Sequence, residues 1–381
     1  MVNFETETKR IKLFDTPGHY NYFQSMITFA GIADYGILLV SAKKGEFENG
    51  FEKTDQNKDQ ILISKIQGIE KIIVAINKMD DMSVKWSKER YEKIKADLSK
   101  FISTIYSIEK EVIFIPISSF LNQNICSRID QKVCDWYSGP SLLEIIDNLA
   151  IPVRDETQGL RIQIYDKMKT SGTSSLIFGK ITSGTAKIGS KVVILPIGNP
   201  SEISNLYNDD ENMIPFASNG EVLSFRLKNI DDESDIYQGS LICGVANVCP
   251  IFQLFNVELK VIGLLKTKPL ISKGYKCIFH MNFIVEEVEF EKLEEKDIET
   301  KLYRPVFFLR ENSIASCVLK STRVICGENN NPQKQKFILR DEGKTIAFGK
   351  ITKLFPFENS KKWHLLTFYK NIEATPGENL N

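Results

Sequence analysis

The sequence lacks an excess of either charge, because 49 Lys and Arg residues balance 49 Asp and Glu residues. Without a global positive field, strong general binding of nucleic acid through counterion release is not expected, and a local basic patch is the alternative that the charge balance leaves open. The 42% of apolar and 26% of charged residues are ordinary for a globular chain, which excludes general disorder. A length of 381 residues exceeds one usual domain, so two to three domains are expected.

Paired cysteines and long apolar runs are also missing. The seven cysteines are scattered and none forms a Cys-x-x-Cys pair, which argues against a disulfide framework and against a zinc site. No apolar stretch reaches the roughly 18 residues of a membrane-spanning helix, and the start of the chain lacks the apolar core of a signal peptide. We therefore expect a reduced, cytoplasmic protein without a membrane partner.

The part of the chain up to Pro152 alternates short apolar runs with segments of helical period. The apolar runs predict buried strands over 35–40, 71–76 and 112–117. Between the last two, Ser87 to Tyr106 places apolar residues at helical spacing, which is the βαβ pattern of a parallel sheet covered by helices. Ser141 and Glu144 have capping-box spacing and predict a last short helix that ends near Pro152.

After Pro152 the helical period disappears, and short strands punctuated by glycine take its place. Such spacing is typical of small antiparallel barrels. The strands expected here include 176–182, 191–195, 221–227, 240–243, 256–262, 275–283 and 313–318. The sequence thus predicts a multi-domain protein: an α/β domain over 1–152, two antiparallel β-barrels over 153–249 and 250–354, and a polar tail over 355–381. The Glu-rich stretch from Glu286 to Glu299 predicts solvated surface, with docking against a basic protein as the alternative.

Asp15-Thr16-Pro17-Gly18-His19 follows the apolar run Ile11 to Phe14 and precedes a helical pattern. In a nucleotide switch, such an Asp can hold a magnesium shell, and the Gly lets its backbone N–H approach a terminal phosphate. Next to that glycine, His19 could orient an attacking water. A Pro-Gly turn after an edge strand, with a merely solvated histidine, explains the same residues equally well.

Asn77-Lys78-Met79-Asp80 directly follows the strand expected over 71–76, at the edge where ligands sit in open α/β sheets. A carboxylate such as Asp80 can accept two N–H groups from the amide edge of guanine, which adenine does not offer, and the Lys78 stem can cover the ring. In isolation, the four residues could also be a polar turn that caps a strand.

Ser118-Ser119-Phe120 follows the next expected strand, where a loop could close over a base. The three elements occur in a consistent order and structural context, so together they are far more specific than each alone. We therefore expect Asp15, Asp80 and Ser118 to face one crevice that holds a guanine nucleotide.

The motif Gly-x-x-x-x-Gly-Lys-[Ser/Thr] does not occur in the sequence. The nearest imitation, Gly172 to Lys180, lacks the second glycine before its lysine and lies in the β-rich half. No Thr of a first switch segment can be identified either. Nothing identifiable cradles the α- and β-phosphates, so we expect the chain as given to bind GTP poorly.

These motifs resemble those of translational GTPases. Asp15 to His19 is similar to the second-switch motif of that family, Asn77 to Asp80 to its guanine-specificity motif, and Ser118 to Phe120 to its last base-contacting loop. The stretch from Gly179 to Pro196 resembles the first strands of its second-domain barrel. Within the superfamily, six stretches resemble the GTP-binding subunits of eukaryotic peptide-chain release factors. They are Phe4–Glu7, Lys44–Lys53, Asn77–Asp81, Trp86–Tyr91, Val285–Glu289 and Arg340–Ala347. The last of these stretches is shared with elongation-factor relatives.

The resemblance implies an amino-terminally truncated, P-loop-type G domain followed by two barrels. It implies a GTPase that hydrolyses GTP to GDP and phosphate during translation termination on the ribosome, in complex with the codon-reading (class I) release factor. Magnesium is the implied metal, held by Asp15 through water, and His19 is the implied catalytic residue. The implied GTP-binding residues are Asp15, Thr16, Pro17, Gly18, His19, Asn77, Lys78, Asp80, Ser118, Ser119 and Phe120.

Three departures from the family pattern leave alternatives open. The phosphate loop and first switch should precede Phe4, so either upstream coding sequence is missing or hydrolysis has been lost. Thr54 to Gln60 replaces a glycine-led family segment, and the tail beyond Leu354 has no counterpart. The alternatives are a ribosome-rescue or tRNA-delivering elongation GTPase, and a binding module that does not hydrolyse GTP.

Overall fold

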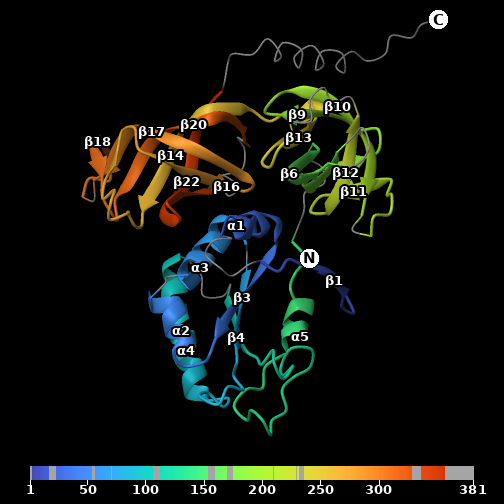
Figure 1. Cartoon of the computed structure of the whole chain (residues 1–381), viewed down its shortest axis with the longest axis vertical. Helices are drawn as coiled ribbons and strands as arrows, with labels where there is room; N and C mark the ends of the chain where they lie inside the picture. The colour runs from blue at the N-terminus through green and yellow to red at the C-terminus, as the bar shows by residue number, and fades with distance from the viewer. Residues whose placement is uncertain are drawn as a thin grey trace, which may run out of the picture. The chain divides into compact units, whose positions relative to one another are not determined.

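The computed structural model describes residues 2–16, 23–53, 56–69, 71–105, 112–152, 159–169, 175–208, 210–228, 230, 236–297, 299–327 and 336–356. The chain divides into two compact units, Met1–Pro152 and Val153–Asn381 (Figure 1). Pro17, Gly18, His19 and the tail from residue 357 onward lie outside the described residues.

The first unit is built on a parallel sheet of three strands in the order β3-β4-β5. These strands are β3 (Tyr35–Ser41), β4 (Lys71–Asn77) and β5 (Val112–Pro116). β4 lies in the middle and is buried from Ile72 to Asn77, which is why its sequence is apolar without alternation. The three strands expected from the sequence are thus confirmed.

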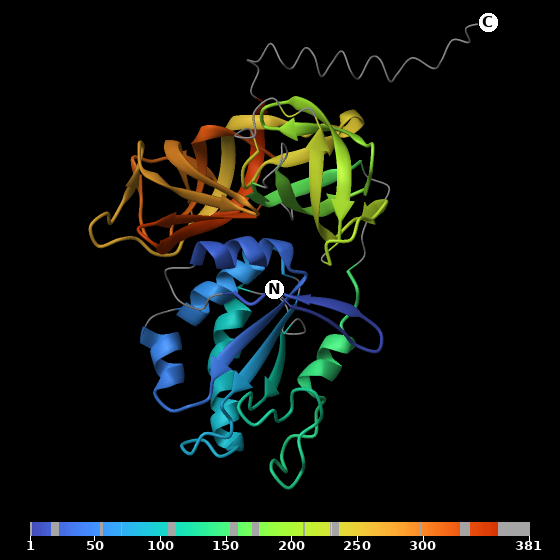
Figure 2. The same cartoon turned by 45° about the vertical axis from the view of Figure 1, so that its right-hand side comes forward.

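Helices lie on both sides of this sheet, as Figures 1 and 2 show from two directions. They are α1 (Phe23–Ile32), α2 (Glu46–Glu48), the π-helical turn η2 (Asn49–Lys53), α3 (Gln56–Ile66), α4 (Lys88–Ile105) and α5 (Leu142–Asp147). On the α5 side, Ile145 packs in one cluster with Ile73 and Ile115 of the sheet. A separate antiparallel hairpin joins β1 (Val2–Glu5) to β2 (Arg10–Leu13).

Both helix starts that the sequence predicted are confirmed. Ser87 precedes α4, and its hydroxyl accepts a hydrogen bond from the backbone N–H of Arg90 at 3.2 Å. At α5, the Ser141 hydroxyl accepts from the Glu144 N–H at 3.3 Å, and the Glu144 carboxylate accepts from the Ser141 N–H at 2.7 Å. This reciprocal pair satisfies N–H groups that the first turn leaves without helical partners.

The second unit begins with a closed barrel in the strand order β10-β12-β7-β6-β13-β9. Its strands are β6 (Arg161–Met168), β7 (Leu176–Ser183), β9 (Lys191–Leu195), β10 (Asn199–Tyr207), β12 (Val222–Lys228) and β13 (Leu241–Gly244). A separate two-stranded antiparallel sheet pairs β8 (Thr185–Lys187) with β11 (Phe216–Ser218). Alternate residues of β7 are buried, because a barrel strand turns every second side chain inward.

A second barrel follows the turn η5 (Val245–Asn247). Six strands close through the order β16-β21-β22-β14-β20-β17 and the additional β16–β17 pairing. They are β14 (Ile251–Val261), β16 (Lys276–Met281), β17 (Ile284–Lys296), β20 (Ile314–Cys326), β21 (Lys336–Asp341) and β22 (Lys344–Pro356). Shorter strands lie at its margin: β15 (Ile271–Ser272), β18 (Tyr303–Pro305) and β19 (Phe308–Leu309). The sequence therefore predicted the architecture correctly: an α/β domain followed by two antiparallel barrels.

Two details of the second barrel extend the expectation. The Glu-rich stretch belongs to β17, where Val288, Phe290 and Leu293 are buried in the barrel core between the glutamates. Its carboxylates lie on both faces of the strand: Glu287 is exposed, whereas the Glu286 side chain is only 12% exposed and lies 3.9 Å from Arg323. β22 runs to Pro356, past the expected boundary at Leu354, because Phe252 of β14 pairs with Pro356.

Within the second unit, a small apolar cluster joins the end of the first barrel to the start of the second. It consists of Val193, Leu195, Leu241, Cys243, Cys249, Ile251 and Cys326. Burial raises the pKa of the Cys326 thiol to about 12, which keeps it protonated and apolar in character. In the described part of the chain, no helix has both the length and the apolar character needed to span a bilayer.

We expect Phe279→Ala to destabilise the second barrel. Phe279 is fully buried, with ring centroids 5.3 Å from Phe255 and 5.1 Å from Phe337. Its removal leaves a cavity and should lower the free energy of unfolding by about 3–5 kcal/mol. Urea denaturation followed by circular dichroism measures this loss. Phe307→Ala, at a side chain that is 92% exposed, is the matched control and should change the value by less than ~0.5 kcal/mol. Equal effects of the two substitutions would contradict this packing.

Candidate functional site

The carboxyl ends of β3, β4 and β5 bring three loops together, at the edge where open α/β sheets bind ligands. The loops begin as continuations of the sheet. The N–H of Ala42 donates to the carbonyl of Asn77 at 2.8 Å, and the N–H of Ile117 donates to that of Ile76 at 2.8 Å. The N–H of Met79 then donates to the carbonyl of Ile117 at 3.3 Å. The sheet thus fixes where each loop starts.

Asn77 ties the loop after β4 to the loop after β5. Its Oδ1 accepts from the backbone N–H of Lys78 at 2.7 Å and from that of Ser119 at 2.9 Å. Its Nδ2 donates to the Ser119 hydroxyl at 2.8 Å. Asn77 is buried, so these bonds are shielded from competition with water. The side chain therefore acts in this site by holding two loops together.

The loop after β5 is short and closed on itself. Ser118 and Gln123 exchange two backbone hydrogen bonds, at 3.1 and 2.9 Å. The Ser118 side chain is fully buried, and its hydroxyl accepts from the N–H of Leu121 at 3.1 Å. The Ser118 side chain thus shapes its own loop from within, and the approach of Ser118 to a base stays a prediction. Ser119 is exposed, and Phe120 is 87% exposed at the tip.

The loop after β4 presents a lysine and a carboxylate. Lys78 has φ 62°, in the left-handed region that few side chains adopt, and such backbone strain gathers at functional sites. The Asp80 side chain is half-buried and has no hydrogen-bond or ion-pair partner among the described residues. A carboxylate in that state can accept the two N–H groups of a guanine edge. The residues of this loop thus fit a guanine base.

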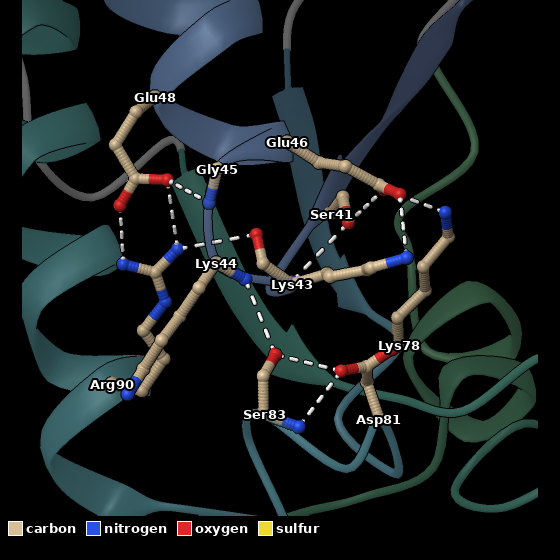
Figure 3. A network of polar contacts seen from close by, with 10 residues as sticks. All are labelled: Ser41, Lys43, Lys44, Gly45, Glu46, Glu48, Lys78, Asp81, Ser83 and Arg90. Carbon is tan, nitrogen blue, oxygen red and sulfur yellow. Dashed lines mark hydrogen bonds and ion pairs between the residues drawn. The ribbon is translucent and has the colours of Figure 1, made fainter.

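A segment after β3, residues 41–48, lies against the loop after β4 and is called the arm here (Figure 3). One oxygen of Glu46, Oε2, accepts from the Ser41 hydroxyl at 2.8 Å and from Lys78 Nζ at 2.6 Å. The other, Oε1, lies 3.3 Å from Lys43 Nζ. The hydrogen bond from Lys78 is the main cause that lowers the pKa of Glu46 to about 2. The arm therefore meets the loop after β4, called the base loop here, at the ammonium group of Lys78.

The far end of the arm is fastened to α4. The Arg90 guanidinium is buried, donates from Nη1 to Glu48 Oε1 at 2.7 Å, and donates from Nε to the Ala42 carbonyl at 2.8 Å. Glu48 Oε2 also accepts from the N–H of Gly45 at 2.8 Å. The bond from Arg90 is the main cause that lowers the pKa of Glu48 to about 2. The arm is thus held at both of its carboxylates.

Sequence reasoning missed Glu46, Glu48 and Arg90 as members of this site. They lie in the stretches 44–53 and 86–91, which were noted only as similar to a family. The only sequence signal was local: Glu46 and Glu48 flank the apolar Phe47 directly after Gly45, a residue type that favours turns. It did not indicate which cations the two carboxylates would meet.

The second-switch candidates are not joined to this site by any described contact. Asp15 is exposed and Thr16 is half-buried, and both follow β2, which pairs antiparallel with β1 and not with the parallel sheet. Pro17, Gly18 and His19 lie outside the described residues. The described residues contain no group of three or more His, Cys, Asp or Glu side chains that could hold a metal ion. The approach of Asp15 to the loops after β4 and β5 stays a prediction.

Two protein families match the chain. Residues 1–152 match the elongation factor Tu GTP binding domain, and residues 256–352 match the GTP-eEF1A C-terminal domain-like family. The first match covers the whole parallel sheet and its three loops. The second covers most of the second barrel.

Curated relatives match over most of the chain. A eukaryotic peptide chain release factor GTP-binding subunit from Zygosaccharomyces rouxii is 38% identical over 357 residues, which covers 92% of this chain and 53% of the relative. The protein of that name from Candida albicans is 37% identical over 356 residues, covering 92% and 49%. The chain thus spans about half the length of these relatives. The crystal structure of the S. cerevisiae Ski7 GTPase-like domain, bound to GDP and inorganic phosphate, has a TM-score of 0.72 at 18% identity and covers 92% of this chain and 82% of that one; it shows a shared fold.

The ion pair of Glu48 predicts a pH dependence of stability. A carboxylate whose pKa is lowered from 4.5 to about 2 in the folded state stabilises that state above pH 4.5. This contribution is lost as the pH falls from about 4.5 toward 2. We therefore expect Glu48→Gln to be less stable than the wild type at pH 7, and the two unfolding curves to converge at low pH.

Urea midpoints measured between pH 7 and the acid limit of folding test this expectation. Glu92→Gln, at an exposed position of α4, is the control for removal of one negative charge. Its urea midpoint should change with pH as steeply as that of the wild type. Parallel pH profiles for the wild type and Glu48→Gln would show that the Arg90 bond does not stabilise the fold.

Proposed function

We propose that the chain belongs to the family of eukaryotic peptide chain release factor GTP-binding subunits and acts in translation termination. In this proposal the protein binds GTP and GDP, hydrolyses GTP, and partners the codon-reading release factor on the ribosome. The residues of this chain contain no identifiable phosphate loop, so they contribute the base site and bind GTP poorly by themselves. The support is similarity over most of the chain, together with a base site whose geometry fits guanine.

The observation that carries the proposal is the hydrogen bonding of Asn77 and Asp80 in the loop after β4. Asn77 is saturated at its oxygen by two backbone N–H groups, so it holds the loops, while the Asp80 carboxylate has no partner among the described residues. A ligand that offers two adjacent N–H donors satisfies Asp80, and guanine has such an edge. Adenine has no such pair of donors on that edge, so the carboxylate would lose its hydration without compensation.

The phosphate side of the site is proposed from the family pattern. Asp15 would hold magnesium through water, and the Thr16-Pro17-Gly18 segment would bring the Gly18 N–H to a terminal phosphate. His19 would orient the attacking water. Magnesium, when bound, supplies positive charge at the phosphate oxygens. A single exposed carboxylate such as Asp15 fits contact through water better than a closed metal cage.

We expect Asp80→Asn to abolish the preference for guanine. Guanosine and adenosine are suitable probes, because nucleosides test the base site without any phosphate contact. The wild-type chain should bind guanosine more tightly than adenosine. Asp80→Asn should weaken guanosine binding by about 10-fold or more, because it exchanges a charged acceptor for an amide. Saturation-transfer NMR titrations report both affinities.

Asp81→Asn is the matched control for this substitution. The Asp81 carboxylate is occupied by the neighbouring Ser83, whose N–H and hydroxyl lie 2.9 and 2.7 Å from Oδ1. The Asp81 variant should therefore keep the guanosine preference. Equal affinity of the wild-type chain for guanosine and adenosine would overturn the assignment of a guanine site.

The proposed partner separates termination from the alternative functions. We expect the immobilised chain to capture the purified codon-reading release factor. Capture of aminoacyl-tRNA or of a ribosome-rescue factor in its place would favour an elongation or rescue GTPase. Capture of the release factor by a chain that shows no guanosine preference would instead support a binding module without nucleotide chemistry. Beads that carry an unrelated barrel protein are the control.

A further inference from the structure

We propose that Glu46 is a positioning residue for the guanine site, which it serves by holding the Lys78 side chain in one place beside the base. The inference rests on the proposed function, because it assigns a role within the same base site. It concerns a residue of the arm, outside the Asn77 to Asp80 motif and outside the loop after β5.

Lys78 is held at both ends. At the backbone, its N–H donates to Asn77 Oδ1 at 2.7 Å and its φ of 62° sends the side chain in a direction that a regular strand would not allow. At the tip, Nζ donates to Glu46 Oε2 at 2.6 Å. The four-carbon stem between these points spans from the loop after β4 to the arm, and about half of the side chain is exposed to solvent.

Glu46 is itself held in place by the arm. Ser41 donates its hydroxyl to the same carboxylate at 2.8 Å, and Lys43 lies 3.3 Å away on the other side. Two further contacts fasten the arm on either side of Glu46. After it, Glu48 pairs with Arg90 at 2.7 Å, and before it, the Lys44 N–H donates to the Ser83 hydroxyl at 3.4 Å. Figure 3 shows all of these contacts between the arm and the base loop with its following helix. The Glu46 carboxylate is thus a fixed anchor point for the lysine.

A fixed lysine contributes to base binding in a way that differs from Asp80. The apolar stem of a lysine can cover the flat face of a ring. A flexible lysine loses rotamer freedom when the ligand binds, whereas a lysine that is already held loses less, so the affinity is higher. The face of a purine is similar for every purine, while its edge is not. Glu46 should therefore set the affinity, and Asp80 the selectivity.

The experiment compares guanosine and inosine binding to the whole chain by saturation-transfer NMR. Inosine lacks the 2-amino group of guanosine, so the ratio of the two affinities reports the edge contact. Glu46→Gln should weaken the binding of both nucleosides by about 3- to 10-fold and leave the ratio of the two affinities unchanged. Asp80→Asn should change the ratio. Glu92→Gln removes one negative charge from an exposed position of α4 and should change neither quantity.

A double-mutant cycle shows whether Glu46 acts through Lys78. Lys78→Met keeps an apolar stem but loses the ammonium group that Glu46 holds. In that background, Glu46→Gln should have no further effect, because two substitutions that break one interaction are not additive. Glu46→Asp keeps the charge on a shorter side chain and should recover part of the lost affinity. This conservative variant also keeps the test valid if Glu46→Gln lowers the thermal midpoint of unfolding.

The results separate this inference from the proposed function. A wild-type chain without preference for guanosine over adenosine overturns the guanine site and this inference with it. A wild-type preference for guanosine together with unchanged affinities in Glu46→Gln overturns the inference alone. Additive losses in the cycle overturn it as well, because they mean that Glu46 acts on binding without Lys78.

Discussion

The arrangement of the site depends on the side chain of Asn77, a single amide that bonds to two loops at once. It accepts one hydrogen bond from its own loop and one from the loop after β5, and it donates a third to that second loop. Without it, the two loops would keep the backbone bond from the Met79 N–H to the Ile117 carbonyl but would lose the side-chain bonds that join Lys78 to Ser119. A buried amide is suited to this task because it offers an acceptor and a donor in one plane. The left-handed backbone of Lys78 and the open carboxylate of Asp80 come directly after this side chain in the same loop.

The ion pairs of the arm give position more than stability. The Glu46–Lys78 pair is exposed by about half at the lysine, and exposed pairs contribute about 0–1 kcal/mol to folding. The Glu48–Arg90 pair differs, since Arg90 is only 9% exposed and also donates to the Ala42 carbonyl. Loss of its partner would leave a buried guanidinium unpaired, which proteins rarely tolerate. The buried pair thus secures the arm, and the exposed pair directs one side chain.

The sequence allowed the fold to be predicted well, because the two halves of the chain have different apolar periods. β4 was predictable from an unbroken run of buried residues, and α4 from apolar residues at helical spacing after the cap Ser87. The Glu-rich β17 escaped prediction as a strand, because its charges hid the alternation of Val288 and Phe290.

The site was predictable only in part. Asn77 and Asp80 belong to a contiguous motif at a strand end, so their place was evident. The inward turn of the Ser118 side chain was not, because whether a serine bonds to its own loop or faces a ligand depends on loop geometry. Glu46 was missed because its partner, Lys78, lies in another loop and only the tertiary fold brings the two together.

The outer strand of the parallel sheet carries a physical consequence of its own. Among the described residues, β3 has a neighbour on one side only, and Ile37 and Leu39 on it are 39% and 59% exposed. A free row of backbone donors and acceptors flanked by aliphatic side chains is a template onto which a strand from another molecule can add. A further strand at this edge would satisfy these backbone groups and cover Ile37 and Leu39.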